Sequence, residues 1–268
     1  MHIGINDTPL HDKLHEQFIN ARPFPMVVLD NFLPAQVAQA LVNEIASFPE
    51  FQRSNDYIFA KNKFESPKIE ALGTAGRAVK GLFLSEEFSA ALTKLYGRPV
   101  FVDPDFVGGG LHRGGEGSYL DMHADFSLHP NNSTWIRELN LLLYLNKDWR
   151  PEYGGSLDLR NAATGETLSV EPLFNRLVIM LTKDFTLHGY KRINFPPGTF
   201  RTSIAAYAYS VATSEEAVAN LRTTTTWVPD NANPLKVAVA KVIPQLIMLK
   251  QRFFGSTTVR KAYEKKSA

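Results

Sequence analysis

The strongest constraint on the fold is the alternation of short apolar runs with turn residues between residues 98 and 212. The runs PVFVD, ELNLLLYLN, RLVIML and RTSIAAYAYS are separated by segments rich in Gly, Pro and Asn. Runs of this length between turn residues are typical of β-strands, and a long succession of them predicts a sandwich or a barrel. No run reaches the roughly 18 apolar residues that a membrane-spanning helix needs.

Helices are predicted on the N-terminal side of this region. Residues 24–30 read as a short buried strand, and the segment 34–48 has apolar residues at helical spacing after Pro34, which suits a first helical turn. Residues 85–96 form a second predicted helix, because Ser85 is a typical N-cap and acidic residues follow it. The expected fold class is α+β and mainly β, with helices packed against a strand-rich core.

Composition narrows the chemistry that such a core can carry. Hydrophobic residues make up 44% and charged residues 21% of the chain, which is ordinary for a globular protein. The chain has no cysteine, so disulfides, cysteine-bound zinc, iron–sulfur clusters and thiol nucleophiles are excluded together. The first residues lack a basic segment followed by an apolar run, so we expect a cytoplasmic protein without a signal peptide.

Charge separates a C-terminal extension, residues 213–268, from the body, residues 1–212. The extension has nine Lys and Arg against four Asp and Glu, a net charge of +5; because the whole chain is +2, the body carries −3. A weakly acidic body argues against a nucleic-acid enzyme. A basic amphipathic pattern covers residues 235–253 and is interrupted by Pro244. We expect it to pack on the barrel or in a homodimer; the alternative is a peripheral contact with an anionic membrane surface.

The residues that point to chemistry are His123 and Asp125 in the stretch SYLDMHAD. On a strand, residues i and i+2 face the same side, so the imidazole and the carboxylate can reach one point in space. Without further partners the same pattern has another explanation, which is an Asp that orients a surface His. Further along the chain lies His188, at the head of another strand, and Arg201 and Ser203 follow on the next strand.

The order of these motifs resembles the iron(II)- and 2-oxoglutarate-dependent oxygenases, in particular their prolyl-4-hydroxylase-like branch. The resemblance covers about residues 100–210, includes the passage LYLN…W…GGSLDL, and extends to the start PFPMVVLDNFL. It implies a double-stranded β-helix of the jelly-roll or cupin type, formed by residues 1–212 with its core at about 98–212 and with helices on one side. It also implies an enzyme that hydroxylates a C–H bond of a protein residue or a small molecule and releases succinate and CO2.

The resemblance also assigns roles to individual positions. The implied Fe(II) ligands are His123, Asp125 and His188. The residues implied to contact 2-oxoglutarate are Arg201, which pairs with its distal carboxylate, and Ser203, Tyr119 and Asn140. The remaining implied reactants are O2 and, as reductant, ascorbate.

Elementary chemistry agrees with these roles and leaves rivals open. Two imidazoles and one carboxylate leave three positions of an iron ion open, as in non-haem Fe(II) oxygenases. A guanidinium offers paired donors to a carboxylate and keeps its charge. Lys191 and Arg192 are rival cations, but they follow His188 too closely to lie on the next strand. A cupin-like protein that binds without turnover, and a zinc hydrolase with the same three ligands, are the alternative functions.

Other polar residues are given structural or peripheral roles. Glu138, Asn140 and Tyr144 are expected on one face of an alternating strand. His129 is expected in a surface loop or a substrate lid, and His15 in a solvated N-terminal segment.

Overall fold

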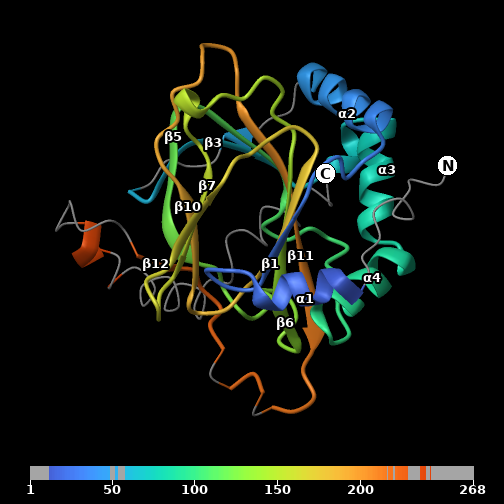
Figure 1. The fold of residues 1–268 in the computed structure, drawn as a ribbon, viewed down its shortest axis with the longest axis vertical. Helices are drawn as coiled ribbons and strands as arrows, with labels where there is room; N and C mark the ends of the chain where they lie inside the picture. The colour runs from blue at the N-terminus through green and yellow to red at the C-terminus, as the bar shows by residue number, and fades with distance from the viewer. Residues whose placement is uncertain are drawn as a thin grey trace.

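The computed structural model describes residues 12–48, 52–53, 58–215, 217–219, 221–228, 236–239 and 242. Its core consists of antiparallel strands that curl into two facing layers, with helices against one of them (Figure 1). This is a double-stranded β-helix of the jelly-roll type, so the predicted fold class is confirmed.

The larger layer is built from strands that lie far apart in the sequence. They are β1 (Met26–Leu29), β2 (Gln52–Arg53), β3 (Ala60–Ser66), β4 (Phe101–Val102), β5 (Gly110–Ala124), β6 (Trp135–Tyr144), β9 (Arg176–Leu181) and β11 (Arg201–Val211). The spatial order is β1, β9, β6, β11 and the first half of β5. Strands β3 and β4 extend the layer by pairing with β5 and β11, and β2 pairs with β3.

The smaller layer is joined to the larger one through β5. Its other strands are β10 (Thr186–Tyr190), β7 (Leu157–Asn161) and β8 (Thr167–Val170), with β12 (Thr226–Trp227) at the end of β5. The first half of β5 pairs with β11, where Gly114 lies opposite Arg201. The second half pairs with β10, where His123 lies opposite His188. One continuous strand therefore belongs to both layers.

Alternation along the strands sorts side chains between the helices and the space between the layers. On β6, Leu139, Leu141 and Leu143 are fully buried in the core cluster that includes the helices. Burying one leucine side chain contributes about 1.5–3 kcal/mol to folding. Asn140 and Tyr144 of the same strand point the other way and contact residues between the layers. The strand thus has one apolar face for stability and one polar face for a site.

Helices cover the outer face of the larger layer (Figure 1). They are α1 (Asp12–Asn20), α2 (Ala35–Ser47), α3 (Thr74–Phe83) and α4 (Glu86–Tyr96), with short 3-10 helices at Ile69–Ala71 and Pro151–Tyr153. The sequence predicts α2 and α4, although Pro34 is the N-cap of α2 and lies before its first turn. It does not predict α1 or α3. The start of α3 is capped from α2, because the Glu44 carboxylate accepts hydrogen bonds from Ala75 N and Gly76 N.

Ser85 caps α4, and its removal should lower stability. Its Oγ accepts a hydrogen bond from Phe88 N at 3.1 Å. We expect Ser85→Ala to lower the free energy of unfolding by about 1 kcal/mol, because a backbone N–H at the helix start loses its partner. Urea unfolding measures the change. Ser89→Ala, inside the same helix, is the control and should stay within about 0.5 kcal/mol of the wild type; equal stability of the two variants would contradict the expectation.

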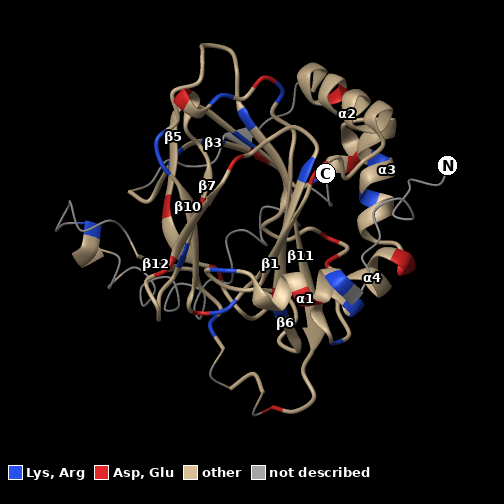
Figure 2. Cartoon of the chain, in the orientation of Figure 1, with Lys and Arg blue, Asp and Glu red and all other residues tan. Residues whose placement is uncertain are grey.

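Charged residues of both signs are spread over the described chain (Figure 2). No helix within the described ranges is long and apolar enough to cross a membrane. The amphipathic pattern predicted over residues 235–253 lies almost entirely outside the described residues, so both of its predicted roles stay predictions. Residues 221–228 and Lys236 of the extension, in contrast, lie against β5.

Candidate active site

Three side chains from two neighbouring strands meet between the layers. His123 lies near the end of β5, Asp125 directly after that strand, and His188 in the middle of β10. Because the strands pair, His188 lies opposite His123, and the two imidazole centroids are 4.2 Å apart. The atoms of the three residues that could bind a metal all lie within 4.8 Å of one another. Two imidazole nitrogens and one carboxylate oxygen at this spacing fit a divalent transition metal such as Fe(II).

Hydrogen bonding and burial prepare the two imidazoles for this role. His123 Nδ1 donates a hydrogen bond to the carbonyl oxygen of Asp121 at 2.9 Å, which leaves the Nε2 lone pair free. Nε2 of each histidine is 3.6 Å from the carboxylate of Asp125. Burial lowers the pKa of His188 to about 3, and the neighbouring His123 adds to the shift. His188 is therefore a neutral imidazole near neutral pH, the form that binds metals.

The carboxylate of Asp125 is held by two residues of β6. Asn140 Nδ2 donates a hydrogen bond to Oδ2 at 2.7 Å, and Arg137 Nη1 lies 3.0 Å from the same oxygen. Burial by itself raises the pKa of Asp125, but the charge of Arg137 and the two nearby imidazoles outweigh it, so the pKa lies well below its usual value. Asp125 is therefore ionised, and its Oδ1 remains for a metal. The amide of Asn140, predicted to contact the cofactor, lies instead against this carboxylate.

A bulge in β6 brings Arg137 and Asn140 to the same face. The register against β11 passes over Glu138, which is the extra residue of the bulge. The prediction that Glu138 shares a face with Asn140 and Tyr144 is therefore wrong. Glu138 turns toward the helices, where its carboxylate accepts a hydrogen bond from Tyr96 of α4 at 2.5 Å.

Arg137 is a site residue that the sequence analysis does not identify. Its side chain is 1% exposed, and its guanidinium lies 3.7 Å from the ring centre of Phe126 and 3.6 Å from that of Tyr207. A buried cation costs free energy unless a partner offsets it, and Asp125 is that partner. The sequence does carry a signal for Arg137: it is a charged residue just before the buried run LNLLLYL. A cation on a buried strand needs a buried anion as its partner.

Arg201 lies at the start of β11, with its guanidinium in the space between the layers. Its Nε donates to the carbonyl oxygen of Gly155 at 2.6 Å, and its Nη2 to the hydroxyl of Tyr144 at 3.1 Å. The guanidinium also lies 4.2 Å from the ring centre of Tyr190. Tyr190 follows His188 by two residues on β10, so the two share a face and are about 6–7 Å apart along the strand. A buried cation therefore lies beside the cluster of His123, Asp125 and His188.

The Gly-Gly turn and Ser203 belong to the same end of the site. Gly155 has φ of +78°, and a Cβ there would lie 3.0 Å from Arg201 Cδ and 2.8 Å from Ile193 Cγ2. Glycine is thus needed for the close approach of this turn to the arginine. Ser203 follows Arg201 by two residues on β11 and is buried on the same face.

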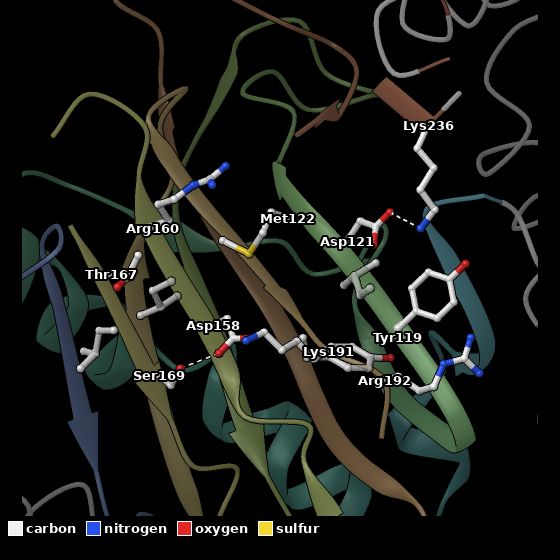
Figure 3. A pocket seen from close by; sticks show the side chains of 14 residues that line it. Tyr119, Asp121, Met122, Asp158, Arg160, Thr167, Ser169, Lys191, Arg192 and Lys236 are labelled. Atoms are coloured by element: carbon white, nitrogen blue, oxygen red, sulfur yellow. Dashed lines mark hydrogen bonds and ion pairs between the residues drawn. The ribbon is translucent and has the colours of Figure 1, made fainter. Parts of the chain in front are cut away.

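The structure places Tyr119 apart from Arg201, contrary to its predicted role. Its hydroxyl donates to the carbonyl oxygen of Ile58 at 3.2 Å. Its ring lies near Lys236 and Arg192, in a groove that residues of β5, β7 and β8 also line (Figure 3). The rival cation Arg192 is thus part of this groove, where its side chain is exposed, whereas Arg201 is 8% exposed. Of these two cations, Arg201 is the buried one.

A bulge in β5 explains the displacement of Tyr119. The three steps from Leu120 to His123 on β5 match only two steps on β10. Counting alternate residues back from His123 therefore assigns Tyr119 to the wrong face. The tyrosine whose hydroxyl contacts Arg201 is Tyr144, in the run LYLN.

Two further histidines differ from the prediction. His129, expected in a surface loop or a lid, is 5% exposed, and its Nε2 lies 3.4 Å from the carboxylate of Asp103. His15, expected in solvent, hydrogen-bonds through Nδ1 to the carbonyl oxygen of Leu95 at 2.9 Å and so joins α1 to α4. Both make structural contacts.

The fold and the site define a class of protein: a jelly-roll domain with a buried two-histidine, one-carboxylate cluster beside a buried arginine. Residues 109–209 match the model of the 2OG-Fe(II) oxygenase superfamily, and this span includes the cluster and Arg201. Over these residues the chain is similar to the 2-oxoglutarate- and Fe(II)-dependent oxygenases.

Solved structures of the same fold include prolyl hydroxylases. One, from Trichoplax adhaerens in complex with a hypoxia inducible factor peptide fragment, is 16% identical with a TM-score of 0.55, and the match covers 78% of this chain and 92% of that one. The Pseudomonas putida prolyl-4-hydroxylase is 17% identical with a TM-score of 0.51, and the match covers 75% of this chain and 98% of that one. A Phytophthora capsici prolyl 4-hydroxylase is 19% identical with a TM-score of 0.54, and the match covers 89% of this chain and 73% of that one. At these identities the likeness shows the fold. The comparison with curated proteins gives no match.

Proposed function

We propose that this protein is a hydroxylase that uses 2-oxoglutarate and O2 to hydroxylate a C–H bond of its prime substrate, with release of succinate and CO2. The observation that carries the proposal is the buried guanidinium of Arg201 beside the cluster of His123, Asp125 and His188. A metal cluster alone suits many reactions. A buried cation on the same face adds a place for a dianionic co-substrate, because it can pair with the carboxylate that does not reach the metal.

In this proposal the three side chains of the cluster hold Fe(II) through His123 Nε2, His188 Nε2 and Asp125 Oδ1. When bound, the iron supplies the redox chemistry between 2-oxoglutarate and O2, with ascorbate as the proposed reductant that keeps it ferrous. Three protein ligands leave three positions for the oxo acid and O2. Asn140 and Arg137 fix the carboxylate of Asp125 and keep it ionised.

Arg201 binds the distal carboxylate of 2-oxoglutarate in this proposal, and its neighbours orient it. Tyr144 and Gly155 hold two of its nitrogens, and the ring of Tyr190 lies near the guanidinium. These neighbours exclude water from the cation, which strengthens its attraction to an anion. In this proposal Ser203, next on the same face of β11, donates a hydrogen bond to the same carboxylate.

The prime substrate that we propose is a protein residue or a small molecule. Support for the first comes from the Trichoplax adhaerens enzyme of the same fold, which is a prolyl hydroxylase in complex with a peptide. The experiment is turnover with Fe(II), ascorbate, 2-oxoglutarate and a library of peptides and metabolites. We expect succinate, together with a product that has gained one oxygen atom by mass spectrometry.

The same library, tested in parallel with Zn(II) in place of Fe(II), ascorbate and 2-oxoglutarate, separates the two alternative functions. A cupin-like binding protein would bind metal and form no succinate with any member of the library. A zinc hydrolase would act on a substrate with Zn(II) and without 2-oxoglutarate. Either result contradicts the proposal.

Asn140 is expected to tune metal affinity through Asp125. Asn140→Leu removes the 2.7 Å hydrogen bond to Oδ2 while nearly conserving volume. Loss of a partner that orients a metal ligand typically costs about 10- to 100-fold in affinity, so we expect at least about a 10-fold rise in the Kd for Fe(II) by anaerobic calorimetry. Asn131→Leu, at an exposed position, is the control. Equal affinities of the two variants would show that Asn140 does not support the ligand.

A further inference from the structure

A succession of aromatic rings leads from the C-terminal extension to the metal cluster. The ring of Trp227 on β12 contacts two others: Phe59 at 4.9 Å with an interplanar angle of 10°, and His123 at 4.8 Å with an angle of 32°. His123 in turn lies 4.2 Å from His188. Phe59 is fully buried, so the rings are anchored in the core at one end and reach the candidate ligands at the other.

Backbone pairing fixes Trp227 to the same stretch of β5. Trp227 lies opposite His123 in the antiparallel pair, and Thr226 lies opposite Ala124. Val228 N donates a hydrogen bond to the carbonyl oxygen of Met122 at 2.8 Å. The contact between the indole and the imidazole is therefore part of a regular strand pairing, which holds both rings in register.

Charged residues of the extension contact the chain just before and just after the end of β5. Arg222 Nε donates to the carboxylate of Asp184 at 2.9 Å, and the Arg222 carbonyl accepts from Ser127 N at 2.8 Å. Lys236 Nζ lies 2.8 Å from the carboxylate of Asp121 (Figure 3). The carbonyl of Asp121 is the acceptor for His123 Nδ1. The extension thus contacts the ring of His123, the residue that orients it and the chain that follows Asp125.

We propose that Trp227 is a positioning residue for His123, and that the C-terminal extension thereby completes the metal site. The inference rests on the proposed function, because it requires a metal at His123. An imidazole binds a metal well when its ring plane and its lone pair are held toward the ion. The Nδ1 hydrogen bond sets the tautomer of His123, and the rings of Trp227 and His188 restrict how far its plane can tilt.

The test uses Co(II) as the probe and the full-length chain throughout. Calorimetry measures the affinity of the protein for Co(II) in the wild type, Trp227→Ala, Trp227→Phe and Trp135→Phe. Trp135 is the control because its ring contacts Phe101 and His129, neither of which belongs to the cluster. We expect Trp227→Ala to raise the Kd for Co(II) about 10-fold or more. Trp227→Phe keeps a ring beside His123 and should restore affinity to within about threefold of the wild type.

Fluorescence gives a second reading that does not depend on a change in affinity. The chain has three tryptophans, and bound Co(II) quenches the emission of an indole that lies close to it. We expect Co(II) to quench the wild type and Trp135→Phe, and to lose most of that effect in Trp227→Phe although this variant still binds the metal. Thermal unfolding of each metal-free variant shows whether the fold is intact.

The outcomes separate the two proposals. Failure of the folded wild type to bind Co(II) overturns the metal site and the proposed function with it. If the wild type binds Co(II) and a folded Trp227→Ala binds it equally well, the positioning role is wrong and the metal site stands. If Trp227→Ala does not fold, the fluorescence decides: unchanged quenching in Trp227→Phe means that the indole is not beside the metal and overturns the inference.

Discussion

Fe(II) binding is expected to fall at least about 100-fold when His188 is replaced by alanine, and succinate formation should fall with it. The estimate is a lower bound, because replacing a residue that only orients a ligand already lowers metal affinity about 10- to 100-fold. His188 is one of only two imidazoles in the cluster, and it is paired directly opposite the other on β10 and β5. Anaerobic calorimetry measures binding, and circular dichroism shows that the strands remain.

A matched control is His129→Gln, which also replaces a buried histidine. His129 contacts Asp103 outside the cluster, so its replacement should leave the Kd for Fe(II) within about threefold of the wild type even if stability falls. Wild-type Fe(II) affinity in a folded His188→Ala variant would exclude His188 as a ligand. The same comparison applies to alanine variants of His123 and Asp125.

The second large effect is expected for Arg201→Ala, which should raise the requirement for 2-oxoglutarate far more than the requirement for the prime substrate. Removing one partner of a buried, hydrogen-bonded charge pair costs about 2–5 kcal/mol, which corresponds to a rise of about 30- to 5000-fold in the KM for 2-oxoglutarate. Fe(II) affinity measured without the oxo acid should change little, because the hydrogen bonds and ring contacts of Arg201 are with Tyr144, Gly155 and Tyr190, outside the three-residue cluster.

Lys191→Ala is the control for this variant, since Lys191 is one of the two rival cations in the sequence and lines the groove of Figure 3. Its KM for 2-oxoglutarate should match that of the wild type. Arg201→Lys keeps the charge but loses the paired donors, so an intermediate KM is expected. An unchanged KM in Arg201→Ala together with a large rise in Lys191→Ala would transfer the role to the lysine.

The fold was largely predictable because its main signals are local. Short apolar runs between turn residues mark the strands, and a serine followed by acidic residues marks the start of α4. Helix α3 lacks such a local signal, because its N-terminal N–H groups are satisfied by Glu44, about thirty residues earlier in the chain. A cap that comes from another helix is visible only once the two helices are packed together.

The cluster was predictable and much of its surroundings was not, for one physical reason. His123 and Asp125 are two residues apart, so their shared face follows from the strand geometry alone. Tyr119 lies beyond a bulge and Glu138 is the extra residue of another, and a bulge depends on how two strands pair. Alternation counted along one strand cannot include it. Trp227 was missed for a related reason, because it reaches His123 only through the pairing of β12 with β5.

The sharing of β5 by both layers has a consequence for which oxo acids the site can accept. Gly114 of this strand lies opposite Arg201 of β11, and His123 lies opposite His188 of β10, so the strands that carry the cation and the cluster both pair with β5. The guanidinium of Arg201 lies 4.2 Å from the ring of Tyr190, two residues from His188 on β10, so the distance between the cation and the cluster is limited by strands that are hydrogen-bonded to one another. A dicarboxylic oxo acid must match that span to reach both. We therefore expect discrimination by chain length: oxaloacetate, one carbon shorter than 2-oxoglutarate, should bind the iron end without engaging Arg201 and should not support turnover.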